Sequence, residues 1–315
     1  MIVRLIDGTW ELFRHYFAIQ GAASRSPRGS AGGAGSDAAV RGAVGTVVGL
    51  LESGSTHVGV ATDHVIESFR NQLWPGYKSS ESIDPELVRQ IPVFEDALGH
   101  LGVTVWPMVD LEADDALASA TSALVDDPQV EQVVIDSPDK DLSQLVRGTS
   151  VVRLDRSRRP ALLVDEKAVV DRYGVGPESL ADWLALVGDS ADGFPGLRGW
   201  GPASTSAVLA RYGHIADIPQ SASDWDVSLP SGASAPKLSA TLESHREEAA
   251  LFLRLATLVV DRSLGQLGAA LAWNGPSAGF DQVCRQLDAP KLAARARAAW
   301  QRTAGGGPPY PAFDA

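Results

Sequence analysis

Short apolar runs alternate along the first half of the chain with longer segments in which apolar residues recur at helical spacing. Four runs predict β-strands, at 2–6 (IVRLI), 57–62 (HVGVAT), 101–106 (LGVTVW) and 132–135 (QVVI). Helices are predicted at 39–53, 84–100, 113–125, 139–146, 166–173, 178–188 and 203–212. This alternation is typical of an α/β fold in which a parallel sheet carries helices on both faces.

The strand pattern stops near residue 165, which predicts a second, mostly helical part. We predict a first domain over 1–164, with an arch or clamp inside it, and a helical domain over 165–302. A disordered tail is predicted over 303–315 (TAGGGPPYPAFDA). Stretches 21–38 and 219–236 are rich in Gly, Ser and Ala and are predicted to be loops.

Composition and charge narrow the class of protein. With 44% hydrophobic and 21% charged residues, the chain is typical of a soluble globular protein. A single cysteine, Cys284, cannot form an internal disulfide, and no Cys/His spacing suggests zinc, which indicates a reducing compartment. Neither a signal peptide nor an apolar run long enough for a membrane span occurs, so we expect a cytoplasmic protein without membrane attachment. A monomer associated with the nucleoid is a further expectation, which depends on the motifs described below.

The net charge of −12 argues against a protein that grips phosphates over its whole surface. One local stretch is basic, RLDRSRRP at 153–160. It predicts either a positive strip that contacts nucleic acid or an ordinary solvated hairpin.

Carboxylates follow the predicted strands. Asp7 and Asp63 end the first and second strands, and Glu112, Asp114 and Asp115 begin the following helix. In open parallel sheets, sites form at the carboxyl ends of the strands. Any one of the helix-start acids can be a capping group, but three together exceed what capping needs.

The same arrangement recurs in DSPDKDLSQLV, where Asp136, Asp139 and Asp141 follow the fourth strand, and in GDSAD, with Asp189 and Asp192. Converging carboxylates repel one another unless cations neutralise them, and oxygen ligands without Cys or His favour Mg²⁺ or Mn²⁺. Two such ions activate water and stabilise the leaving oxygen in phosphodiester hydrolysis. A Ca²⁺ storage site is the competing hypothesis, but the spacing of a calcium loop is absent.

Taken in order, these motifs resemble the 5′→3′ exonuclease and flap endonuclease family, which includes the nuclease domain of bacterial DNA polymerase I. The matching pieces are LIDGTWELFR (5–14), FRNQLWPGYK (69–78), LEADDALA (111–118), DSPDKDLSQLV (136–146), YGVGPESLADWLALVGDSADGFPGLRGWGPAS (173–204) and, more weakly, SHREEAALFLRLATLVVD (244–261). The resemblance implies a stand-alone member with a PIN-like parallel sheet flanked by helices and a C-terminal helix-hairpin-helix (H3TH) domain.

The resemblance also implies roles for the acidic residues. Two or more Mg²⁺ or Mn²⁺ ions are expected, one surrounded by Asp7, Asp63, Glu112, Asp114 and Asp115 and the other by Asp139, Asp141, Asp189 and Asp192. Asp136 lies outside the pattern and is predicted to be a strand-end cap. Lys140 is expected to point away from its neighbours, and Leu142 and Leu145 to anchor the helix in the core.

The remaining site residues are expected to contact DNA. Lys78, Arg14 and Arg70 match basic positions that steady the scissile phosphate, although an ordinary surface ion pair is the alternative for each. Phe13 matches an aromatic that stacks on a terminal base, with a core role as its alternative. The hairpin GLRGWGPAS is expected to bind duplex phosphates, and K⁺ is a further expected ion there; its residues are Gly196, Gly199, Gly201 and Ser204.

Three departures from the family pattern are present. Glu81 replaces an arginine, Gly193 and Phe194 replace Asn and Ile, and Ala203 replaces a lysine. We expect them to alter DNA affinity and substrate preference more than the chemistry.

The sequence therefore predicts a metal-dependent 5′→3′ exonuclease and 5′-flap endonuclease that acts on DNA with 5′ ends or flaps in replication or repair. Two alternatives stay open. One is a DNA-junction binding protein without catalysis, and the other is an RNA-cleaving PIN-like nuclease.

Overall fold

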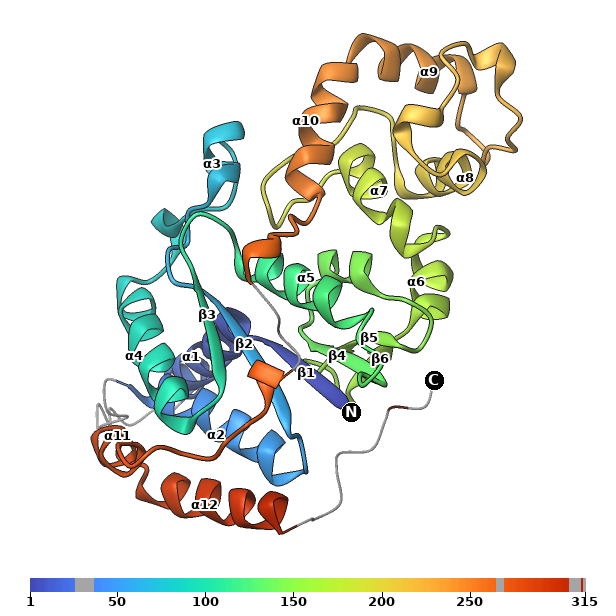
Figure 1. Ribbon diagram of the computed structural model, residues 1–315. Helices are drawn as coiled ribbons and strands as arrows, with labels where there is room; N and C mark the ends of the chain where they lie inside the picture. The colour runs from blue at the N-terminus through green and yellow to red at the C-terminus, as the bar shows by residue number, and fades with distance from the viewer. Residues whose placement is uncertain (26–36, 265–268, 306–312, 314–315) are drawn as a thin grey trace. The chain divides into compact units, whose positions relative to one another are not determined.

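Strands and helices alternate along the first half of the chain in the computed structural model, which describes residues 1–25, 37–264, 269–305 and 313 (Figure 1). The chain forms two compact units that interleave in sequence. Among the described residues, the first unit comprises those of Met1–Ile66, Ser80–Ser137 and 260–313, and the second comprises Glu67–Ser79 and Pro138–Val259. Since the units interleave, the sequential boundary at residue 164 stays a prediction.

A parallel sheet organises the first unit. Its strands are β1 (Ile2–Asp7), β2 (His57–Asp63), β3 (Thr104–Met108) and β4 (Gln132–Asp136), in the spatial order β3-β2-β1-β4. Parallel strands end at one edge of the sheet, so the last residues of β1 and β2, Asp7 and Asp63, lie at the same edge. The predicted positions of both aspartates at strand ends are confirmed.

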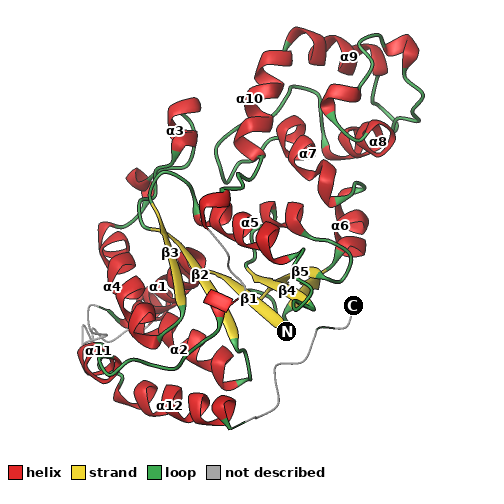
Figure 2. Cartoon of the chain, in the orientation of Figure 1, coloured by secondary structure: helices red, strands yellow, loops and turns green. Residues whose placement is uncertain are grey.

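Helices cover both faces of this sheet (Figure 2). On one side lie α1 (Gly8–Arg25), α2 (Ala38–Glu52) and α4 (Pro85–Leu101), and α5 (Ala113–Leu124) lies on the other. Two later helices, α11 (Phe280–Gln286) and α12 (Pro290–Ala304), pack against α4 and α2 and close the core.

Three predicted boundaries in the first unit need correction. The strand predicted from residue 101 begins at Thr104, because Leu101 ends α4 and Gly102 terminates that helix with a φ of 84°. The loop predicted at 21–38 is helical through Arg25, and 26–36 lie outside the described residues. The tail predicted from residue 303 begins later, because helix α12 continues to Ala304. Beyond Gly305, Phe313 is the residue of the tail that the structure describes.

The second unit is mostly helical. It contains α3 (Phe69–Leu73), α6 (Glu166–Tyr173), α7 (Leu180–Val187), α8 (Pro202–Tyr212), α9 (Ala235–Ser244) and α10 (Arg246–Ala256). Helices α7 and α10 pack closely against each other, and Phe252 of α10 stacks on Phe194 with ring centroids 5.7 Å apart. The predicted helical character of this part of the chain is confirmed.

Two strands of the second unit were not predicted as such. β5 (Val151–Asp155) and β6 (Leu162–Val164) form an antiparallel hairpin whose turn carries the basic stretch. The helix predicted at 139–146 is a short 3₁₀ helix, η2 (Asp141–Leu145). The other 3₁₀ turns are η1 (Ser80–Ser82), η3 (Pro177–Ser179), η4 (Ile215–Asp217), η5 (Ala222–Asp224), η6 (Arg262–Leu264) and η7 (Ala269–Leu271).

Among the described helices, none combines the length and apolarity that a bilayer span requires.

Candidate metal centre and nucleic-acid interface

The acids of the first unit lie at the carboxyl edge of its sheet; we call Asp7, Asp63, Glu112, Asp114 and Asp115 the first acidic set. Asp63 Oδ1 accepts a hydrogen bond of 2.7 Å from the Ala113 amide, which joins the end of β2 to the start of α5. Asp7 accepts from the Trp10 amide at 2.9 Å and from the Ser137 hydroxyl at 2.8 Å. Both strand-end carboxylates are therefore held by donors of the protein itself.

The start of α5 supplies the other three acids. Glu112 is the N-cap, and its amide donates to Asp115 Oδ2 at 3.0 Å in a reciprocal capping box. Both side chains are buried, with Asp115 fully so, while Asp114 is half-buried. Glu112 and Asp115 thus perform the capping role that was the alternative for single acids, in addition to any role toward a cation.

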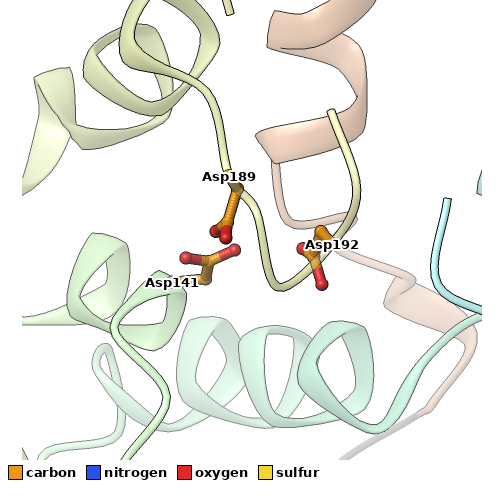
Figure 3. Close-up of side chains that lie close together, drawn as sticks. All are labelled: Asp141, Asp189 and Asp192. Atoms are coloured by element: carbon orange, nitrogen blue, oxygen red, sulfur yellow. The ribbon is translucent and has the colours of Figure 1, made fainter. Parts of the chain in front are cut away.

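Three acids of the second unit form a tighter cluster; with Asp139 they are the second acidic set. Asp141, Asp189 and Asp192 each offer a carboxylate oxygen, and these oxygens lie within 4.8 Å of one another (Figure 3). The three residues are 6%, 4% and 8% exposed. Asp139 belongs beside them because its Oδ1 accepts from the Asp141 amide at 2.9 Å. Across the described part of the chain, no other acids or histidines form such a group.

A tight loop after α7 presents two of these carboxylates. The main chains of Asp189 and Phe194 exchange hydrogen bonds of 2.8 and 3.0 Å, which closes the loop. Gly193 has a φ of 83°, and a Cβ there would lie 1.9 Å from the carbonyl oxygen of Gly76. Glycine is therefore required at this position, one of the departures from the family pattern.

Lysine ammonium groups lie among these acids. Lys140 Nζ hydrogen-bonds Asp189 Oδ2 and lies 3.3 Å from Asp141 Oδ1. The expectation that Lys140 points away is wrong, because burial of two carboxylates next to it makes a cation there favourable. Lys78 Nζ lies 3.1 Å from Asp192 Oδ1, and the Tyr77 hydroxyl donates to Asp192 Oδ2 at 3.3 Å.

The pKa values of Asp141 and Lys140 are both shifted by the charges of the cluster and by burial. Burial, followed by the charge of Asp139, holds the pKa of Asp141 well above its usual range, although Lys140 opposes this. Burial lowers the pKa of Lys140, but the charge of Asp141 and the hydrogen bond to Asp189 outweigh it, so that pKa is raised. The site therefore favours an added positive charge.

The predicted phosphate contacts lie in different environments. Lys78 is 37% exposed at the cluster. Arg14, 33% exposed on α1, pairs with Glu11 and donates to the Thr46 hydroxyl at 3.2 Å. Arg70 is buried, and its guanidinium donates to the carbonyls of Leu255 and Thr257 at 2.9 and 3.0 Å. Arg70 is thus committed to the main chain, and we remove it from the groups expected to contact phosphate.

The surroundings of Phe13 fit its core alternative in part. It is half-buried against the core of the first unit. The centroid of its ring lies 6.4 Å from that of Phe17, in an edge-to-face arrangement. Phe17 is 57% exposed. The stacking role of Phe13 stays a prediction.

The glycine hairpin before α8 divides into a packed part and an open part. Gly196 has a φ of 68°, and a Cβ there would lie 2.3 Å from the amide nitrogen of Gly188. By contrast, a Cβ at Gly199 or at Gly201, the N-cap of α8, would have open space around it. Buried Ser204 donates its hydroxyl to the Gly201 carbonyl at 3.0 Å. The open part is where a phosphate can approach main-chain amides.

Asp136 is not a cap. Arg4 donates to both of its carboxylate oxygens, at 2.8 and 2.6 Å, and both side chains are buried. Val134 pairs with Arg4 and Asp136 with Ile6, so the two charged residues lie on one face of neighbouring strands. A charged residue within each of two buried runs was the sequence signal for this pair. Leu142 is buried as expected, and Leu145 is half-buried.

Comparisons with known proteins identify relatives of this chain. A model of the N-terminal resolvase-like domain of 5′-3′ exonucleases matches residues 2–174, and a model of their C-terminal SAM fold matches residues 175–278. The 5′-3′ exonuclease of Buchnera aphidicola is 30% identical over 217 residues, which cover 68% of this chain and 71% of that protein.

DNA polymerase I of Mycobacterium tuberculosis is 33% identical over 218 residues, 68% of this chain. The match spans only 23% of that polymerase. Among solved structures, the T5 D15 protein with metal ions has a TM-score of 0.60 at 18% identity, covering 93% of this chain and all of that one. The catalytic core of Rad2 with DNA has a TM-score of 0.59 at 14% identity, covering 94% and 91%. The predicted fold class is confirmed.

Proposed function

Because the chain belongs to the 5′-3′ exonuclease family, we propose that it is a divalent-metal-dependent nuclease that hydrolyses DNA phosphodiesters. It acts as a 5′→3′ exonuclease and a 5′-flap endonuclease near junctions of single- and double-stranded DNA. Clean-up in replication or repair, such as primer removal, is the corresponding role. The cytoplasmic location and monomeric state stay predictions.

The observation that carries this proposal is the cluster of Asp141, Asp189 and Asp192, with ligand oxygens within 4.8 Å of one another. Its donors are all carboxylate oxygens, which fit Mg²⁺ or Mn²⁺. The first acidic set would hold one such ion and the second set another. Bound divalent ions supply charge stabilisation at phosphoryl oxygens and an activated water.

The chain's own residues supply positioning. Lys78, beside Asp192, is placed to pair with a phosphate that approaches the cluster. The open main chain at Gly199 and Gly201, with the amides at the start of α8, offers donors to duplex phosphates and a place for K⁺. Main-chain donors explain how a chain with a net charge of −12 holds DNA.

Two structural relatives support DNA as the substrate. The T5 D15 flap endonuclease is known in a pseudo-enzyme-product complex with DNA and metal ions, and the Rad2 catalytic core in complex with a DNA substrate. Each is under 20% identical to this chain, at 18% and 14%. We extend their substrate class to this chain as part of the proposal.

The test is cleavage of a labelled 5′-flap duplex in Mg²⁺ or Mn²⁺. We expect cleavage near the junction, and a loss of at least about 10³-fold in Asp114→Ala and in Asp139→Ala, since ligand loss removes several kcal/mol of transition-state stabilisation. The matched control is Asp171→Ala, an exposed acid of α6 that pairs with Lys167. It should cleave at the wild-type rate.

Two other outcomes would replace the proposal. Flap binding in Ca²⁺ without turnover in Mn²⁺ would identify a junction-binding protein. Preference for an RNA flap over a DNA flap of the same sequence would identify an RNA-cleaving nuclease.

A further inference from the structure

Two ammonium groups face the three clustered carboxylates of the second unit. Lys140 contacts both Asp189 and Asp141, and Lys78 contacts Asp192. The lysines therefore neutralise the oxygens that a divalent ion would need.

An ammonium group and a metal ion cannot share these oxygens without cost. Divalent ions bind carboxylate oxygens at about 2.0–2.6 Å. An ion bound to Asp141 and Asp189 would lie next to Nζ of Lys140, and the two positive charges would repel each other within a buried site. One cation therefore has to leave when the other binds.

Lys140 is the lysine that can leave. Its side chain is 31% exposed, and four flexible carbons allow its ammonium group to turn into water. The main chain of Lys78 is fixed, because its amide donates to the Asp192 carbonyl at 3.1 Å and its carbonyl accepts from the Asn71 side chain at 2.8 Å, but these bonds do not hold its ammonium group. Lys140 is the stronger candidate because its ammonium group contacts two of the three carboxylates.

We propose that Lys140 is an internal competitor for the divalent ion of the second acidic set. Its charged ammonium group pairs with the carboxylates of Asp141 and Asp189 and moves away from both when an ion binds. Lys140 thus sets the ion concentration at which the site fills. This inference rests on the proposed function, because it assumes that the second acidic set binds a metal.

A purely structural role for Lys140 predicts the opposite sign. If its ammonium group holds Asp141 and Asp189 in the arrangement that a metal needs, its removal weakens ion binding. If it competes, its removal strengthens binding. The direction of the change in affinity separates the two roles.

The test measures Mn²⁺ binding to the full chain without DNA, by the electron paramagnetic resonance signal of free Mn²⁺. Lys140→Met keeps an unbranched side chain that is one heavy atom shorter and removes its charge. We expect its Kd for Mn²⁺ to fall at least about tenfold, since a neighbouring charge shifts such equilibria by one to three decades. The control, Lys167→Met, removes an 80% exposed lysine of α6 and should leave the Kd unchanged.

A Kd that is unchanged or higher in Lys140→Met overturns the inference. No binding of Mn²⁺ to the wild-type chain overturns the proposed function instead, so the two failures are distinguishable.

Wild-type protein provides a second measurement if Lys140→Met does not fold. The ¹⁵Nζ signal of an ion-paired lysine is observable by NMR, and Mg²⁺ is diamagnetic. We expect the Lys140 signal to shift or vanish as Mg²⁺ is added, while that of Lys167 stays. A Lys140 signal that persists unchanged at saturating Mg²⁺ overturns the inference.

Discussion

The two acidic sets contain the same kind of side chain but have different partners. In the first set, Asp7, Asp63 and Asp115 accept hydrogen bonds from main-chain amides at the starts of helices. In the second set, Asp189 and Asp192 face lysine ammonium groups. Asp139 and Asp189 also accept main-chain amides, so the feature that distinguishes the second set is the ammonium groups added to such contacts.

This difference separates two ways of placing carboxylates for a cation. Amide donors position a carboxylate permanently, so we expect Asp7, Asp63 and Asp115 to contribute to folding as well as to the site. Ammonium partners neutralise a carboxylate until another cation replaces them. We therefore expect substitutions in the first set to lower the free energy of unfolding. Neutralisation of a carboxylate in the second set should raise it.

Asp136 breaks this division and gives the largest expected effect on stability. It lies in the first unit, yet its partner is a cation, the buried guanidinium of Arg4. Arg4→Met removes the guanidinium that pairs with a buried carboxylate, which should lower the free energy of unfolding by about 3–5 kcal/mol. Chemical denaturation in the presence of EDTA measures this loss.

The control is the double variant Arg4→Met with Asp136→Leu, which replaces the pair with apolar side chains and should recover most of the loss. Addition of Mg²⁺ should not rescue Arg4→Met, because this pair is part of the sheet and not an ion site. Rescue by Mg²⁺ would show that Asp136 belongs with the second set.

Local patterns predicted part of this site. Asp7 and Asp63 were placed correctly at strand ends, because the apolar runs before them specify the strands through local periodicity. The ion pair of Asp136 and the burial of Arg70 depend on partners 132 and 185 residues away. No local pattern contains such contacts.

The predicted orientation of Lys140 was wrong for a related reason. Sequence spacing alone places Lys140 between two acids without showing that Asp189, 49 residues later, lies against it. The β5–β6 hairpin was missed as a pair of strands because Arg153 interrupts the apolar pattern of β5 and β6 is only three residues long. Hydrophobic periodicity therefore does not identify a strand that a charged residue interrupts, nor a contact between charged residues far apart in the sequence.

Opposite changes in stability would sharpen the comparison of the two sets. Asp115→Ala removes the acceptor for the Glu112 amide and should cost about 1 kcal/mol of stability. Asp141→Asn should raise stability without divalent ions at neutral pH, since burial and Asp139 keep the pKa of Asp141 high and penalise its charge. Denaturant midpoints in EDTA measure both changes.

Asp171→Asn provides the control, because its carboxylate is exposed and pairs only at the surface of α6. Its midpoint should stay at the wild-type value. If Asp115→Ala and Asp141→Asn change stability in the same direction, amide and ammonium partners are equivalent and the comparison fails.

Asp182 of α7 joins both kinds of partner in one carboxylate and gives the smallest expected effect. Its Oδ1 accepts from the Ile215 amide at 2.8 Å, and its Oδ2 lies 2.9 Å from His214 Nδ1. The hydrogen bond to Asp182 raises the pKa of His214 above its ordinary value of 6.5. Protonated His214 therefore stabilises the fold, fully below about pH 6.5 and progressively less as pH rises through the raised pKa.

His214→Gln should accordingly lower stability by less than about 1 kcal/mol at pH 5.5, since the imidazole is half-exposed, and by almost nothing at pH 8.5. Asp182→Asn keeps an acceptor for the Ile215 amide and removes the charge, so it should abolish the pH dependence of the His214 contribution while retaining the amide contact. Denaturation midpoints of the wild type, both single variants and the double variant across this pH range measure the coupling. A coupling of zero at every pH would show that His214 does not contribute through Asp182 and that the Ile215 amide is the partner that matters.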